Sequence, residues 1–210
     1  MEDATSQPFY EEFSFFSPVR RYVRSVRRIF SDPVAYFREI DQRNSLLGPL
    51  TFAVISTIGP LMVLICLILF LEVVADGIQG LAMFHMSGVF GIALGTLVAL
   101  VGPALITIVL LLVFSCVSHL VVLLVLRRGN AGFRATFRAN AYSSLGMLLG
   151  YAPVIGGLAF FYGFYLVMVG IREFHFTSTI RAVVVTLVSI PLTLIMIGYG
   201  LRLLGGLLDA

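Results

Sequence analysis

The organisation of this chain follows from residues 127–182, which read RRGNAGFRATFRANAYSSLGMLLGYAPVIGGLAFFYGFYLVMVGIREFHFTSTIRA. A basic, glycine-containing loop opens the stretch, a short polar segment closes it, and residues 139–171 between them carry no charge. As one helix, that uncharged run would measure roughly 50 Å, well beyond a hydrocarbon core of about 30 Å. Because Pro153, Gly156 and Gly157 interrupt it, we predict a hairpin of two short membrane legs.

The composition of the whole chain also indicates a protein surrounded by lipid. Apolar residues make up 59% and charged residues 12% of the sequence, and the mean hydropathy is +1.02. Soluble domains are roughly half apolar and a quarter charged. Since a spanning segment must satisfy its own backbone hydrogen bonds, we predict an all-α, polytopic membrane helix bundle over residues 46–210.

The first predicted span, residues 46–71, contains no charge and is long enough to cross the bilayer. Gly48 and Pro49 stand at its start. Pro60 lies inside it and removes one helical hydrogen bond, so a kink is expected there.

A longer uncharged run, residues 78–126, would reach roughly 70 Å as one helix. We predict a break at Pro103 that leaves residues 104–126 as a full crossing. Residues 82–100 are then re-entrant or lie along the outer interface, because counting them as a further span would carry the next arginines outside, against the positive-inside rule.

Small residues recur at every fourth position of the 82–100 segment, which predicts close packing against another helix of the chain or of a second copy. The stripe consists of Ser87, Gly91, Gly95 and Ala99.

Pro191 interrupts the last apolar run, residues 182–204. The five predicted spans are residues 46–71, 104–126, 139–152, 155–171 and 182–204. This arrangement keeps 13 of the 14 arginines cytoplasmic, with the N-terminus inside and the C-terminus outside. If residues 139–171 formed a single span, 12 of the 14 would be cytoplasmic, so the alternative stays open on charge alone.

Residues 18–45 precede the first span and follow an unassigned N-terminal segment, residues 1–17. Apolar residues recur there at helical spacing, and arginines fill the opposite face, which predicts basic amphipathic helices. The arginines are Arg20, Arg21, Arg24, Arg27 and Arg28. We expect contact with anionic lipid headgroups. Packing on the protein's own inner loops, or contact with nucleic acid or a partner protein, are the alternatives.

Several segments together resemble one family. They are Gly48-Pro49, the sequence GNAGFRATF at residues 129–137 with AYSS at 141–144, the turn APVIGG at 152–157, and Gly170-Ile171 followed by His175 and Arg181-Ala182. This pattern is similar to the Yip (Ypt/Rab-interacting protein) membrane domain in its prokaryotic form, over roughly residues 32–204. The resemblance implies five spans and a cytoplasmic N-terminus.

Eukaryotic members of that family are associated with Rab GTPase binding and vesicle traffic, whereas prokaryotic members have no agreed activity. The present chain departs from the eukaryotic pattern just before Gly48. An acidic residue and an aromatic are expected there, but Ser45, Leu46 and Leu47 are found. This departure argues against a Rab-type partner.

Catalytic signatures are missing from the sequence, and no Asp or Glu falls inside a predicted span. His119, with Ser115 and Ser118 on nearly the same helical face, forms a candidate intramembrane polar site. A histidine bonded to a neighbouring helix, a proton-handling histidine and a metal ligand are the three readings. His85 and His175 are expected to be solvated near the interfaces.

We therefore predict a non-enzymatic membrane scaffold or adapter with no cofactor, no metal and no nucleic-acid partner. Its expected partners are the bilayer, anionic lipids at the N-terminal helices, and a protein partner or a second copy. The expected location is the bacterial cytoplasmic (inner) membrane. The alternative is a small transporter or channel with His119 in the conduction or proton path.

Overall fold

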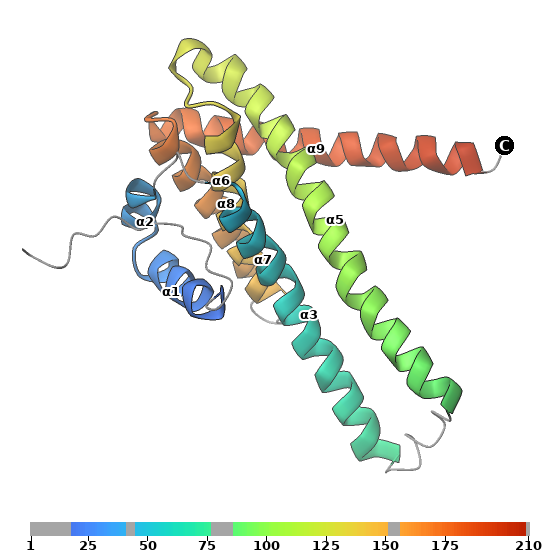
Figure 1. Ribbon diagram of the computed structural model, residues 1–210. Helices are drawn as coiled ribbons and strands as arrows, with labels where there is room; N and C mark the ends of the chain where they lie inside the picture. Colours follow the sequence, from blue (N-terminus) through green and yellow to red (C-terminus); the bar gives the residue numbers. More distant parts are fainter. Residues whose placement is uncertain (1–17, 41–44, 77–85, 151–155, 209–210) are drawn as a thin grey trace, which may run out of the picture.

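The computed structural model describes residues 18–40, 45–76, 86–150 and 156–208. Within these ranges the chain forms helices and no strands, so the predicted all-α class is confirmed (Figure 1). The helices are α1 (Pro18–Ser31), α2 (Pro33–Glu39), α3 (Leu47–Asp76), α5 (Met86–Leu126), the 3-10 turn η1 (Arg127–Gly129), α6 (Phe133–Ser143), α7 (Leu145–Gly150), α8 (Gly156–Phe174) and α9 (Thr179–Leu208).

The two long helices α3 and α5 pack side by side and run in opposite directions (Figure 1). The predicted break in the second of them is wrong, because α5 continues through Pro103 as one helix of 41 residues. A break would leave several backbone groups at each new helix end without partners, whereas a proline inside a continuous helix removes only one donor. In an apolar solvent the continuous helix is the less costly choice.

The other predicted break points within the described residues lie either at the start of a helix or inside a continuous one. Gly48 and Pro49 lie in the first turn of α3, where the missing proline N–H is not needed. Pro60 and Pro191 lie inside the continuous helices α3 and α9. Gly156 and Gly157 begin α8, and Pro153 is outside the described residues.

The predicted hairpin corresponds to α6 and α7 on one side and α8 on the other, and both α6 and α7 pack against α8. The backbone N–H of Ala131, before the hairpin, donates to His175 Nδ1, after it, over 3.0 Å. The chain between them therefore leaves and returns to the same end of the bundle, as a hairpin over residues 139–171 requires.

In the part of the chain that the structure describes, four helices are long and apolar enough to cross a membrane. They are Leu47–Leu67, Leu97–Leu126, Gly156–Phe174 and Thr179–Leu203. The other predicted crossing corresponds to α6 and α7, which are separate helices of 11 and 6 residues divided at Ser144. Nine consecutive residues of α6, 135–143, are buried, so this helix is enclosed by protein rather than lipid. The total of five crossings and the orientation of the termini stay predictions.

Glycines let α8 approach α6 and α7 closely. A Cβ built on Gly146 would lie 2.8 Å from the Cα of Gly163, and one on Gly170 would lie 2.8 Å from the Cβ of Ala139. For the predicted stripe of small residues, Gly95 has no atom within 4 Å of where its Cβ would be, and Ala99 is half-buried. The surroundings of Ser87 and Gly91 lie outside the described set, so close packing of this stripe stays a prediction.

The N-terminal helices belong to the core. Phe37 of α2 makes edge contacts with Tyr142 of α6 and Phe174 of α8, with ring centroids 6.3 Å and 5.5 Å apart. Asp32 caps α2 by accepting from the backbone N–H of Ala35 over 2.9 Å. By contrast, α9 crosses the bundle and continues beyond the other helices to the C-terminal end (Figure 1).

Candidate functional site

Helix α1 has a buried apolar face, an exposed apolar face and an arginine face. The predicted apolar stripe is divided between the first two. Ile29 is fully buried, and Tyr22 packs against the same core. Val19, Val23 and Phe30 are instead 69%, 57% and 44% exposed. The predicted arginines follow around the helix: Arg20, Arg24 and Arg27 are exposed, and Arg21 and Arg28 are half-buried. Packing on the chain itself therefore leaves Val19 and Val23 largely uncovered, whereas Phe30 is partly covered by Tyr162 of α8.

A chain of buried hydrogen bonds joins α5, α6 and the α8–α9 turn. His119 Nδ1 lies 3.1 Å from Thr136 Oγ1, and Thr136 Oγ1 lies 3.0 Å from His175 Nε2. The other nitrogen of His175 accepts from the N–H of Ala131. Thr136 has no exposed surface and His175 is 2% exposed, so the link is shielded from water.

The backbone N–H of Ala131 determines which nitrogen of His175 carries the proton. Because the Ala131 N–H can only donate, His175 Nδ1 must carry a lone pair, and the proton of the neutral ring is on Nε2. His175 Nε2 therefore donates to Thr136 Oγ1, which shares a second hydrogen bond with His119 Nδ1. The geometry requires a neutral His175.

The burial of His175 contradicts the expectation that solvation explains it. Burial away from water disfavours the charged imidazolium and lowers the pKa of His175 to about 4. Its partner Ala131 lies 44 residues earlier in the sequence, so no local pattern could have indicated the contact. His85 is outside the described residues.

Both serines that were grouped with His119 are buried within the protein, and Ser115 contacts α6. Ser115 is fully buried, and its hydroxyl oxygen accepts from Asn140 Nδ2 over 3.2 Å. The Ser118 oxygen is buried and has no hydrogen-bond partner in the described part of the chain. His119 itself is half-buried and meets the ring of Phe133 edge-on, with centroids 5.7 Å apart. The predicted polar site is thus a helix–helix contact between α5 and α6.

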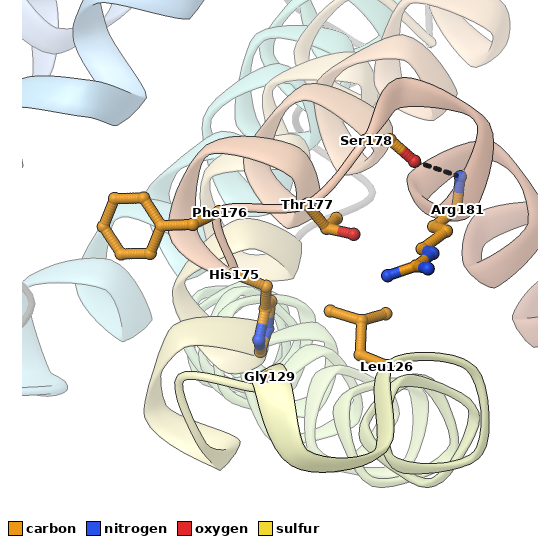
Figure 2. A pocket seen from close by; sticks show the side chains of 7 residues that line it. All are labelled: Leu126, Gly129, His175, Phe176, Thr177, Ser178 and Arg181. Atoms are coloured by element: carbon orange, nitrogen blue, oxygen red, sulfur yellow. Dashed lines mark hydrogen bonds between the residues drawn. The ribbon is translucent and has the colours of Figure 1, made fainter.

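A small pocket of about 380 Å³ opens beside His175 (Figure 2). Leu126 and Gly129 line one side, and residues 175–178 and Arg181 line the other. Figure 2 shows the Arg181 guanidinium and the Thr177 hydroxyl turned toward the same space. Ser178 caps α9 through a long contact of 3.5 Å to the N–H of Arg181.

Ion pairs tie α2 to this end of the bundle. Arg38 of α2 lies 3.1 Å from a Glu173 oxygen, and Arg172 lies 2.6 Å from the other oxygen of the same carboxylate. Arg28 also pairs with Glu39 across the α1–α2 junction. Among the described residues, no group of three or more His, Cys, Asp or Glu side chains could hold a metal ion.

One comparison with known proteins identifies the family. The family model described as the Yip1 domain matches residues 27–201, which is most of the chain. The chain belongs to the Yip1 domain family. No curated protein and no solved structure matches it significantly. The resemblance that the sequence segments indicated is confirmed at the level of the family, and this Yip1 domain is an integral membrane protein.

Two buried polar residues of this Yip1 domain were not predicted from the sequence, Thr136 and Asn140, and His175 was expected to be solvated. Thr136 and Asn140 are four residues apart, so both lie on one side of α6. That spacing was available from the sequence, but the predicted boundary at residue 139 placed Thr136 in a basic loop and Asn140 in a membrane leg. Arg138 in the same helix is also buried, and it donates to the carbonyl of Ser45 over 3.2 Å.

Proposed function

We propose that this Yip1 domain is a non-enzymatic scaffold or adapter that lays α1 on an anionic membrane surface. The observation that carries the proposal is the exposed apolar edge of α1, formed by Val19, Val23 and Phe30, next to its arginines. A soluble helix docked on its own domain would turn such residues inward. Lipid acyl chains suit the edge, and headgroup phosphates suit the arginines, at about 1 kcal/mol for each basic residue near the surface.

The position of α1 supports an interfacial role. Tyr22 contacts α3, where its hydroxyl lies 3.1 Å from Ser56 Oγ. At the other end of α1, Phe30 stacks on Tyr162 of α8 with centroids 5.2 Å apart. The helix therefore runs across two helices of the bundle. From Ser56, α3 continues to Asp76 over about 30 Å, the thickness of one hydrocarbon core.

We infer that the arginine-rich end faces the cytoplasm of a bacterial cell, because cytoplasmic segments carry an excess of basic residues. The helix α1 would then lie in the inner leaflet. A bilayer-embedded bundle with a basic helix at its edge is suited to gather anionic lipid and to hold a partner protein or a second copy at that surface. The prokaryotic type is part of this proposal.

A tryptophan reporter tests the orientation of α1, because the natural chain contains no tryptophan. The full-length Val23→Trp variant, reconstituted with brominated anionic lipids, should show strong fluorescence quenching. The matched Arg24→Trp variant, on the neighbouring arginine face, should show much less. Equal quenching of the two variants would contradict the proposal. Replacing the five α1 arginines by Gln should weaken the preference for anionic over zwitterionic brominated lipids.

The second candidate is a small transporter, favoured by the hydrogen-bonded chain from His119 to His175. The chain ends at the Ala131 N–H, which does not release its proton readily, so it gives no continuous proton path. In proteoliposomes with a pH-sensitive dye, transport through this site predicts a proton flux that is lost in His119→Ala. Wild-type protein without flux across a solute and pH screen would remove this candidate.

A further inference from the structure

The pocket at the α8–α9 turn is separate from the α1 surface and has a different chemistry. It is concave, about 380 Å³ in volume, and closed on one side by Leu126 and Gly129 (Figure 2). Its polar groups come from the turn and from the start of α9. A few polar groups that converge in a concave site are the usual mark of a small-ligand site.

The first of these groups is the Arg181 guanidinium, which points into the pocket (Figure 2). No carboxylate is among the residues that line the pocket. The nearby carboxylate of Glu173 is already engaged by Arg38 and Arg172. Within the described residues Arg181 has no ion pair, so its positive charge is available to an anion from outside the chain.

The second group is the hydroxyl of Thr177. Its oxygen has no hydrogen-bond partner in the described ranges and almost no surface open to solvent, so a phosphate reaches it when the half-buried side chain rotates about χ1. The backbone positions it, because Phe176 adopts a left-handed conformation with φ of 49° and the Thr177 N–H donates to the Arg172 carbonyl over 3.0 Å. A shielded hydroxyl without a partner loses free energy unless a ligand or water bonds to it. This observation is independent of the charge on Arg181.

The groups that line the pocket indicate the sign of the ligand's charge. Both nitrogens of His175 are already used, so its ring forms a neutral wall of the pocket. The first turn of α9 adds backbone N–H groups and the positive end of a 30-residue helix. We propose that this pocket binds a phosphate group, held by the Arg181 guanidinium and the Thr177 hydroxyl. Phosphate matches the planar fork of arginine and can accept from the hydroxyl at the same time.

The phosphate can belong to an anionic phospholipid headgroup or to a soluble phosphate compound. Phe176 is 87% exposed and Ile180 is 77% exposed beside the pocket. These two side chains could enter the acyl region while the headgroup occupies the pocket. The pocket contains no residue of α1. The phosphate proposal and the proposal for α1 can therefore fail independently of each other.

The test uses the full-length protein and two substitutions, Arg181→Gln and Thr177→Val. The control is Arg202→Gln, which removes an exposed arginine from the far end of the same helix. One arm counts anionic phospholipids retained in mild detergent by native mass spectrometry. The other arm titrates delipidated protein with inorganic phosphate and follows heat release.

If the wild type and the control retain anionic lipid and both variants lose it, the ligand is a lipid headgroup. Saturable phosphate binding, with lipid retention unchanged, identifies a soluble compound. In either case Arg181→Gln should weaken occupancy about tenfold or more, and Thr177→Val a few-fold. If Arg181→Gln does not fold, Arg181→Lys with Thr177→Val gives the same comparison. Equal occupancy in wild type and variants in both arms overturns the proposal.

Discussion

Thr136 is the residue that holds the buried polar chain together. Its single hydroxyl accepts from His175 and shares a second hydrogen bond with His119, so it links α5 and α6 to the α8–α9 turn. Three polar groups at this depth are tolerable only because each has a partner. Removing the hydroxyl therefore affects two histidines at once.

Thr136→Val keeps the shape of the side chain and removes the hydroxyl. The buried His175 N–H then has no acceptor, and we expect the free energy of unfolding to fall by about 1–3 kcal/mol. Unfolding in mixed detergent measures the loss. Thr51→Val is the control, because the exposed Thr51 hydroxyl bonds only to the Leu47 carbonyl of its own helix. Similar losses in the two variants would contradict the role given to Thr136.

His175 makes a further prediction, about pH. Its folded pKa of about 4 lies below the ordinary histidine value of 6.5, so the unfolded chain binds the proton more readily. The stabilisation is fully present above pH 6.5 and is lost as the pH falls from 6.5 to 4, by about 3 kcal/mol in all.

Unfolding measured at several pH values tests this expectation. The wild type should lose stability on acidification across that window. His175→Gln should be less stable at pH 7 and should have a flatter profile. Parallel profiles for the two proteins would show that another group governs the acid response.

At the scale of the elements, α8 packs closely against α6 and α7. Backbone meets backbone there: the Cβ of an alanine at Gly146 would lie 2.8 Å from Gly163 Cα and 2.9 Å from the Ala159 carbonyl. Neither atom can turn aside as a flexible side chain would. This contact therefore sets the spacing of the hairpin.

Gly146→Ala should force α7 and α8 apart and lower the free energy of unfolding by about 1–3 kcal/mol. Gly198→Ala is the matched control, since Gly198 lies inside α9 with no atom within 4 Å of the added methyl group. The control should be neutral or slightly stabilising, because alanine favours helix over glycine by up to about 1 kcal/mol. Thermal unfolding in detergent compares the two. A neutral Gly146→Ala would mean that the helices are less closely packed.

At the scale of the whole molecule, three arginine-bearing segments meet at one end of the bundle. The α5–α6 connection touches the α8–α9 turn through Ala131 and His175, and α2 joins them through Arg38 and Glu173. The end of α3 at Asp76 and the start of α5 at Met86 lie at the opposite end of the long helix pair (Figure 1). The positive-inside rule then predicts one cytoplasmic end.

Cysteine labelling in whole cells measures this orientation. With Cys66 and Cys116 replaced by serine, Ala131→Cys should be protected from a membrane-impermeant maleimide until the cells are permeabilised. Gly206→Cys, near the C-terminal end of α9, should react in intact cells. Labelling of Ala131→Cys in intact cells would reverse the predicted topology.

Composition and periodicity were sufficient for the properties that depend on neighbours within one helix. The uncharged runs predicted the apolar solvent and the helical class, and the spacing of apolar residues and arginines predicted α1. Family membership could also be read from turn and small residues. These features are local, so a linear pattern carries them.

Contacts between distant segments needed the folded chain. Three features depend on what lies alongside the element. They are the continuity of α5 through Pro103, the burial of His175, and the division of the apolar stripe of α1 between half-buried Tyr22 and exposed Val23. The reason is physical: an apolar run looks the same whether lipid or another helix covers it. Which polar side chain meets which is set by the packing of whole helices, and Thr136 between two histidines is the result.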